Sequence, residues 1–116
     1  MDTQPSSGTP GLDVRVSYQD DEATLSLSGE LDIATAPAVR SHFNTLDEHR
    51  TVVLDLAGVT FIDSSGLGLI LECQGQAAAK GASLILRNPG PQAQRLFEVA
   101  GVRQALHVEE PESPQR

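Results

Sequence analysis

The stretch VVLDLAGVTFIDSSGLGLIL, residues Val52–Leu71, contains the transition that decides the fold. The valine-rich run Thr51–Leu56 is short and nearly continuous in its apolar residues, which predicts a strand covered on both faces. From Ser64 to Lys80 the apolar residues follow helical spacing, and Gly81 can close this helix at its C-terminal end. A buried strand that leads through a short loop into a helix is typical of α/β domains.

Two strands and a helix are predicted before this stretch. Apolar and polar residues alternate over Leu12–Tyr18, and Leu25 and Leu27 alternate with hydroxyl side chains, so both segments have the period of a half-buried strand. The polar run Gln19–Glu22 between them has the length of a hairpin turn. A helix is then predicted over about residues 35–47, because Thr35 precedes a proline and an apolar stripe of helical spacing.

The chain after the central stretch continues the alternation of strands and helices. Ser83–Arg87 predicts a buried strand, and Ala93–Ala100 predicts a helix that ends before a glycine. Ala105–Val108 predicts a short last strand. The predicted order β-β-α-β-α-β-α-β describes one α/β domain, with a mixed sheet that starts from a hairpin and has helices packed on it. Right-handed crossovers bring FIDSSGLG (Phe61–Gly68) to the carboxyl edge of the sheet, where sites in such folds usually lie.

The two ends of the chain differ in composition from its middle. The chain has 116 residues, a length that favours one domain. Residues 1–11 consist mostly of small and turn-forming residues and predict a disordered tail. The folded domain is predicted over residues 12–108, and residues 109–116 predict an acidic, flexible tail.

Composition excludes several classes of function. With a formal net charge of -8, the chain has no basic surface to neutralise phosphates, so direct binding to nucleic acid or to an anionic membrane is not expected. No apolar run approaches the ~20 residues of a membrane span, and the N-terminus lacks the features of a signal peptide. Cys73 is the only cysteine, which is compatible with a reducing compartment. We therefore expect a cytoplasmic protein.

No cofactor is expected from the motifs. The three histidines and the single cysteine show no metal-ligand spacing. The chain also lacks the glycine-rich loop with lysine that holds the phosphates of a nucleotide.

The run Asp63–Gly66 allows three interpretations. Asp63 or Ser64 can cap the helix, because a side-chain oxygen accepts an otherwise unpaired first-turn N–H group. Ser64 could be a catalytic nucleophile at a strand-to-helix turn, with His107 as base, although the first glycine of the nucleophile motif is replaced by Ile62. Ser64 could also be a hydroxyl that another protein phosphorylates, since the start of a helix tolerates a negative group.

Glycines in the predicted helix indicate a surface on which another molecule docks. Gly66, Gly68 and Gly75 each cost about 1 kcal/mol relative to alanine inside a helix. Glycine also lets another backbone come close. A phosphate on Ser64 would add about -1.5 to -2 charges beside Asp63, and in an interface that charge would be buried at a cost of several kcal/mol. Modification would then release a partner without unfolding the domain.

Three segments together resemble the STAS domain, and most closely its bacterial anti-sigma factor antagonist branch. They are GELDIATAPAV (Gly29–Val39), VVLDLAGVTFIDSSGLGLIL (Val52–Leu71) and GASLILRNPGPQAQRLFEVAGV (Gly81–Val102). The likeness covers nearly all of the predicted domain, and the DSSGLG core after a VxLDL strand is its most specific part.

The resemblance implies a switch protein that is not an enzyme. In that family the unphosphorylated antagonist binds an anti-sigma factor that is also a serine kinase, and this binding releases a sigma factor. The kinase uses ATP and Mg²⁺ to phosphorylate the serine after the aspartate, and a PP2C-type phosphatase reverses the modification. By position the acceptor is Ser64, and the partner-binding surface comprises Asp32, Asp63, Ser65, Gly66, Leu67 and Gly68. For Asp32 a plain role in the loop before Thr35 stays open.

One departure and one rival accompany this resemblance. Many relatives end in a further amphipathic helix, whereas here the end VEEPESPQR is short, acidic and interrupted by proline. The rival is a STAS scaffold or interaction subunit of a larger signalling or transport complex, whose binding ignores phosphorylation. An enzyme that uses Ser64 is the other alternative.

Overall fold

The hairpin that starts the domain forms where the alternation predicts it. In the computed structural model, which describes residues 2–3, 7–46 and 49–109, strand β3 (Leu12–Gln19) pairs antiparallel with β4 (Glu22–Leu31). Leu12, Val14 and Val16 are buried, while the residues between them are exposed. One face of this hairpin therefore joins the core, as expected for a strand with period 2.

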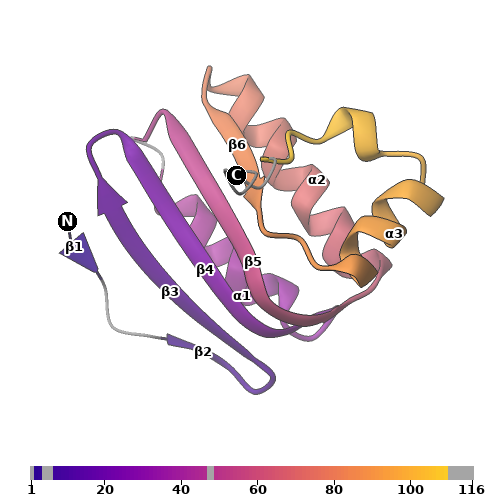
Figure 1. The fold of residues 1–116 in the computed structure, drawn as a ribbon. Coiled ribbons are helices and arrows are strands. Elements are labelled where there is room, and N and C mark those ends of the chain that lie inside the picture. Colours follow the sequence, from indigo (N-terminus) through magenta and orange to yellow (C-terminus); the bar gives the residue numbers. More distant parts are fainter. Residues whose placement is uncertain (1, 4–6, 47–48, 110–116) are drawn as a thin grey trace, which may run out of the picture.

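Strand β5 (Thr51–Ile62) is longer than predicted. It lies parallel to β4 on one side and to β6 (Ser83–Arg87) on the other, in the sheet order β1-β3-β4-β5-β6 (Figure 1). The sequence predicted an end at Leu56, because the apolar run stops there. The strand continues because its backbone still pairs with β4, past two register shifts, although β6 pairs only as far as Asp55. Backbone pairing does not require apolar side chains.

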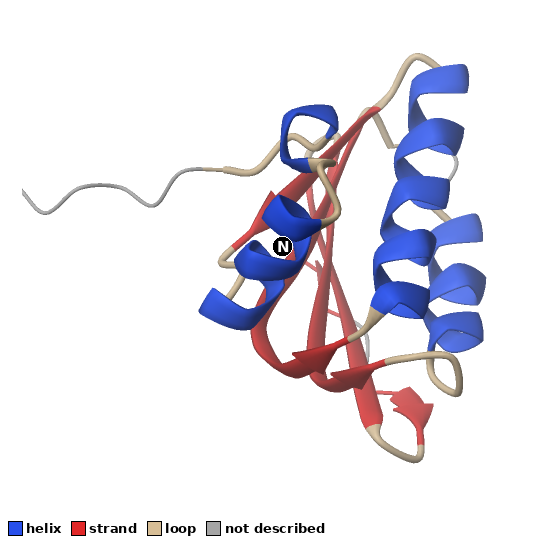
Figure 2. Ribbon diagram, turned by 90° about the vertical axis from the view of Figure 1, so that its right-hand side faces the viewer, coloured by secondary structure: helices blue, strands red, loops and turns tan. Residues whose placement is uncertain are grey.

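The helices cover the two faces of the sheet unequally. Helices α1 (Ala36–Asn44) and α2 (Ser64–Ala79) lie side by side on one face, and α3 (Pro91–Val99) lies on the opposite side (Figure 2). A bidentate ion pair joins α1 to α2, with Arg40 Nε 2.8 Å from Glu72 Oε2. The stripe predicted for α1 is buried, but the helix ends at Asn44, and Asp47 lies outside the described residues. The predicted glycine ends of α2 and α3 are confirmed, with Gly81 at φ 76° and Gly101 at φ 73°.

The prediction of a disordered tail over residues 1–11 needs correction at residues 2–3 and 7–9, whereas residues 1 and 4–6 lie outside the described residues. Strands β1 (Asp2–Thr3) and β2 (Ser7–Thr9) both pair antiparallel with the outer edge of β3. The composition of the segment gave no apolar signal for a strand. An edge strand, however, offers unpaired backbone N–H and C=O groups to any extended segment, whatever its side chains.

The predicted last strand, Ala105–Val108, is reduced to a single bridge. A short 3₁₀ helix, η1 (Arg103–Ala105), takes the start of the segment, and only Val108 pairs, in parallel, with Leu86. Two backbone hydrogen bonds flank this pair, from Leu86 N to His107 O and from Glu109 N to Leu86 O.

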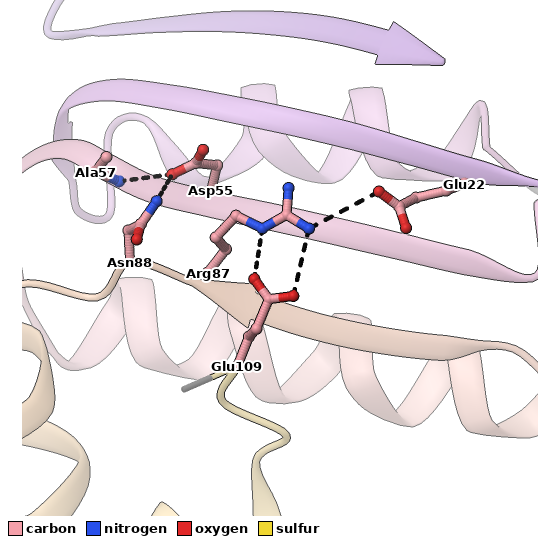
Figure 3. A network of polar contacts seen from close by, with 6 residues as sticks. All are labelled: Glu22, Asp55, Ala57, Arg87, Asn88 and Glu109. Atoms are coloured by element: carbon pink, nitrogen blue, oxygen red, sulfur yellow. Dashed lines mark hydrogen bonds and ion pairs between the residues drawn. The ribbon is translucent and has the colours of Figure 1, made fainter. Parts of the chain in front are cut away.

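Glu109, predicted as the start of a flexible tail, is held by side-chain contacts on the sheet. The Arg87 Nε atom lies 2.6 Å from Glu109 Oε1, and its Nη2 atom lies 3.9 Å from Glu22 Oε2 across β5 (Figure 3). The hydrogen bond from Arg87 lowers the pKa of the Glu109 carboxyl. Residues 110–116, where the absence of a further helix was expected, lie outside the described residues.

Candidate functional site

Asp63 is the residue that caps helix α2. Its Oδ1 atom accepts hydrogen bonds from Ser65 N at 2.9 Å and from Gly66 N at 3.0 Å. It is also the only residue between β5 and α2, so it turns the chain directly from strand to helix. This confirms the capping role, and it assigns that role to Asp63 and leaves the Ser64 side chain out of it.

Ser64 is the first residue of α2, and it is exposed. Ser65 is half-buried, and its backbone N–H is used by the cap. Because the cap occupies Asp63, the Ser64 hydroxyl is available at the surface beside a carboxylate and near the positive end of the helix dipole. Of the two serines, Ser64 is therefore the more accessible to another protein.

Asp32 lies at the same edge of the sheet as Ser64. Leu31 is registered beside Ile62, and Asp63 N donates to Leu31 O at 3.3 Å, so the loops after β4 and β5 start next to each other. The Asp32 Oδ1 atom accepts hydrogen bonds from Ala34 N at 3.0 Å and from Thr35 N at 3.1 Å. The plain loop role is thus present in the structure, and a half-buried Asp32 keeps some surface for contact as well.

Gly66 and Leu67, assigned from sequence to the partner-binding surface, are buried. A Cβ atom on Gly66 would lie 2.5 Å from Leu31 O and 2.8 Å from Ile62 Cγ1. Glycine at this position is therefore required by contact of α2 with the ends of β4 and β5. The docking explanation is wrong for Gly66, because its neighbours belong to the same chain.

Gly68 and Gly75 are different, because the described chain does not require glycine at either position. A Cβ atom on either residue would have no neighbour within 4 Å, and both are exposed. Gly68 follows Ser64 by four residues, so the two lie on the same face of the helix. The exposed start of α2 thus presents the Ser64 hydroxyl on the same helix face as Gly68, which has no side chain to cover the backbone.

Two large apolar side chains are exposed near this edge. Ile33, in the loop after Asp32, is 75% exposed, and Phe61, near the end of β5, is 44% exposed. Exposed aromatic and aliphatic side chains are the kind of anchor that protein interfaces bury. Sequence reasoning assigned neither to the surface, although Phe61 was part of the quoted FIDSSGLG run.

Gln92 closes the free edge of β5, and sequence reasoning missed it. Its Oε1 atom accepts from Ile62 N at 2.9 Å, and its Nε2 atom donates to Ile62 O at 2.7 Å. These two bonds replace the backbone partners that β6 does not supply beyond Asp55. No sequence signal identifies such a contact, because a glutamine after Pro91 is equally common on an exposed helix face.

We expect Gln92→Ala to destabilise the domain by about 1–3 kcal/mol, because it removes both partners of the Ile62 backbone. Urea unfolding followed by circular dichroism measures this loss. Gln94→Ala is the matched control, since Gln94 lies on the same helix and makes one exposed bond to Pro89 O. An equal loss in both variants would contradict a specific role for Gln92.

The nucleophile interpretation of Ser64 fails on distance. The apolar segment around His107 predicts a buried, structural histidine, but His107 is exposed, and its backbone carbonyl accepts a hydrogen bond from Leu86 N. Leu86 is level with Leu54 in the sheet, and Ile62 lies eight residues further along β5. At ~3.3 Å per residue this is on the order of 26 Å of strand, far beyond hydrogen-bond reach. His107 therefore cannot serve as base for Ser64.

Within the part of the chain that the structure describes, other reactive groups are not gathered into a site. Burial raises the pKa of the Cys73 thiol to about 12, so it stays protonated at neutral pH. Among residues 2–3, 7–46 and 49–109 no group of three or more His, Cys, Asp and Glu side chains could hold a metal ion. In the same part of the chain no helix is both long and apolar enough to cross a membrane.

Comparison with known proteins identifies the family. The family model described as "Mlab, STAS domain" matches residues 14–108. The chain belongs to the STAS domain family. Among curated relatives, the anti-sigma-B factor antagonist of Staphylococcus aureus (strain NCTC 8325 / PS 47) is 28% identical over 101 residues, which cover 85% of this chain and 94% of that protein.

Solved structures of anti-sigma factor antagonists share the fold. An anti-sigma factor antagonist from Mycobacterium paratuberculosis superposes with a TM-score of 0.79 at 24% identity, over 90% of this chain and 91% of that chain. The anti-sigma factor antagonist SpoIIAA in its unphosphorylated form superposes with a TM-score of 0.71 at 24% identity, over 84% of this chain and 88% of that chain. The phosphorylated form of the Bacillus protein SpoIIAA superposes with a TM-score of 0.66 at 24% identity, over 84% of this chain and 91% of that chain.

Proposed function

We propose that this STAS domain is an anti-sigma factor antagonist that is switched by phosphorylation of Ser64. In its unphosphorylated form it binds an anti-sigma factor that is also a serine kinase, and the bound sigma factor is released. A PP2C-type phosphatase restores the active form. The observation that carries the proposal is the exposed Ser64 hydroxyl at the first residue of α2, directly after the Asp63 cap. Relatives named as antagonists support it.

The docking surface consists of residues at the sheet edge where this hydroxyl lies. We define it as Ile33, Phe61, Ser64 and Gly68, with the half-buried Asp32, Asp63 and Ser65 beside them. Ile33 and Phe61 provide apolar area, and bare backbone at Gly68 allows a close approach. The surface holds carboxylates and no basic side chain, so the expected partner surface is apolar at its centre and basic at its rim.

Phosphorylation acts on this surface through charge. The serine oxygen attacks the γ-phosphorus of the ATP held by the kinase, its proton passes to a base of the kinase, and ADP leaves. The product carries about -1.5 to -2 charges next to the Asp63 carboxylate. In the free domain water solvates these charges, whereas in the complex they would be buried together, so the modified form leaves its partner. The chain itself needs no cofactor for this cycle, which requires a cytoplasmic location with access to ATP.

Phosphate mapping tests the proposal. The full chain is incubated with its anti-sigma kinase and Mg²⁺–ATP, and the modified peptide is sequenced by mass spectrometry. We expect the label on Ser64, its loss in Ser64→Ala and its retention in Ser65→Ala. Label on Ser65 alone, or partner binding that is equal with and without the phosphate, would contradict the switch and favour a non-switching STAS scaffold.

Gly68→Ala and Gly75→Ala separate docking from folding. Each adds a Cβ atom in open space within a helix, so each should stabilise the free domain by about 0.5–1 kcal/mol. Only Gly68→Ala should weaken partner binding, by about tenfold or more, because Gly75 lies two turns further from Ser64 on the same face. Thermal unfolding and titration calorimetry with the partner measure the two effects. Equal binding by both variants would contradict a docked backbone at Gly68.

A further inference from the structure

The outer edge of β3 has hydrogen-bonding groups on alternate residues. Glu30 N donates to Gly11 O at 2.8 Å, so Gly11, just before β3, directs its backbone groups toward β4. Thr51 N donates to Asp21 O, so Asp21, just before β4, directs its backbone groups toward β5, and the even-numbered residues of β4 face β3. Because the direction of backbone groups alternates along a strand, the N–H and C=O groups of the odd-numbered residues of β3 point toward β4. The even-numbered residues therefore direct their N–H and C=O groups to the outer edge; they are Leu12, Val14, Val16 and Tyr18.

Strands β1 and β2 cover this edge. Ser7 is registered with Val14 and Thr9 with Leu12, while Asp2 is registered with Tyr18. The residues of these two strands are Asp-Thr and Ser-Gly-Thr, without a single apolar type. Such a composition predicts a cover held mainly by backbone hydrogen bonds, which can be exchanged for those of another strand.

We infer that this N-terminal cover blocks an edge through which two copies of the chain can pair. In the arrangement we propose, β3 pairs antiparallel with β3 of a second copy, and Val14 lies opposite Val14 of that copy. Leu12 then lies opposite Val16, so residues with outward hydrogen-bonding groups face each other along the pair. All three side chains belong to the core face and are at most 5% exposed, so the joined sheets would continue one apolar layer.

Charge selects this register over its neighbours. Asp13 and Arg15 are exposed on the other face of β3. In the proposed register Asp13 lies opposite Arg15 of the second copy, and Arg15 lies opposite Asp13 of that copy. A shift of two residues one way would place Asp13 opposite Asp13, and the other way Arg15 opposite Arg15. Like charges directly opposite each other destabilise a strand pair, and opposite charges stabilise it. A symmetric pair of strands also closes on itself and gives a dimer with two-fold symmetry.

The test uses the full chain with the cover weakened by proline. Ser7→Pro combined with Thr9→Pro removes two N–H groups that face β3. Gly8→Pro is the matched control, because the N–H of the residue between them points away from β3. With size-exclusion chromatography and light scattering, we expect the wild type and Gly8→Pro to have the mass of one chain. The double variant should show a twofold mass as its concentration rises.

The register is tested in the same double variant. Adding Arg15→Asp should weaken dimerisation at least tenfold, and the swap Asp13→Arg with Arg15→Asp should restore it. Hydrogen exchange at Val14 reports whether the cover has been released. A double variant with fast exchange and the mass of one chain would overturn the proposal. The proposal would also be overturned by unchanged hydrogen exchange at Val14 or by a dimer of the wild type. Larger aggregates of the double variant, or a dimer that is insensitive to Arg15→Asp, would overturn it as well.

Discussion

Replacing Gly66 by alanine is expected to destabilise the domain by about 2 kcal/mol, the largest loss among the glycine positions of α2. The new Cβ atom would lie 2.5 Å from the Leu31 carbonyl oxygen and 2.9 Å from Leu31 Cγ. Since these neighbours are a backbone atom and a buried side chain, α2 and β4 must move apart, and overpacking of this kind costs about 1–3 kcal/mol or more. The gain in helix propensity, about 1 kcal/mol, offsets only part of this cost.

Urea unfolding of Gly66→Ala and Gly68→Ala measures the contrast. The two variants make the same chemical change two residues apart in one helix, and they should shift the free energy of unfolding in opposite directions. If Gly66→Ala is as stable as the wild type, the close contact between α2 and the end of β4 is wrong. The expected loss also has a functional consequence, because this contact holds the loops of Asp32 and Ser64 next to each other.

Ser64→Asp is expected to lower partner affinity at least a hundredfold while leaving the fold intact. A buried charge without a partner costs several kcal/mol, and each 1.4 kcal/mol is a tenfold change in affinity. In the free domain Ser64 is exposed at the start of a helix, where an acidic side chain is tolerated, so the free energy of unfolding should change by less than about 0.5 kcal/mol. Titration calorimetry with the anti-sigma factor, together with urea unfolding, measures both quantities.

Two variants make this result specific to position and charge. Ser64→Ala should bind the partner like the wild type and should resist the kinase. Ser65→Asp carries the same charge one residue later, in a half-buried position, and should weaken binding less. Equal loss of affinity in Ser64→Asp and Ser65→Asp would indicate a general effect of negative charge. Loss of folding in Ser64→Asp would instead mean that Ser64 has a structural role.

Sequence patterns were most reliable where side chains alone specify the structure. The alternation in Leu12–Tyr18 predicted the first strand of the hairpin, and Gly81 and Gly101 predicted the ends of α2 and α3. Asp63 and Ser64 before the helix predicted a cap, which the structure assigns to Asp63. These features depend on contacts within a few residues, so the local sequence contains the information that determines them. The motif around Ser64 also led to the STAS family, which the family comparison confirmed.

The same patterns misled where backbone pairing or distant contacts decide the structure. The second half of β5, from residue 57 to Ile62, and strands β1 and β2 pair without an apolar pattern. His107 stands in an apolar segment and is nevertheless exposed, because the segment forms one bridge at the edge of the sheet. Gly66 and Gly68 look alike in the sequence, and only their tertiary neighbours distinguish them.

By itself, the sequence determined the α/β architecture, the position of the helix that starts at Ser64, and the acidic character of the molecule. Only the tertiary structure decided that Ser64 is exposed, that Gly66 is required by the end of β4, and that Gln92 closes the edge of β5. The physical reason is the range of the interactions. Periodicity and capping act between residues close along the chain, whereas exposure and packing depend on segments about 30 residues apart that meet only when the sheet has formed.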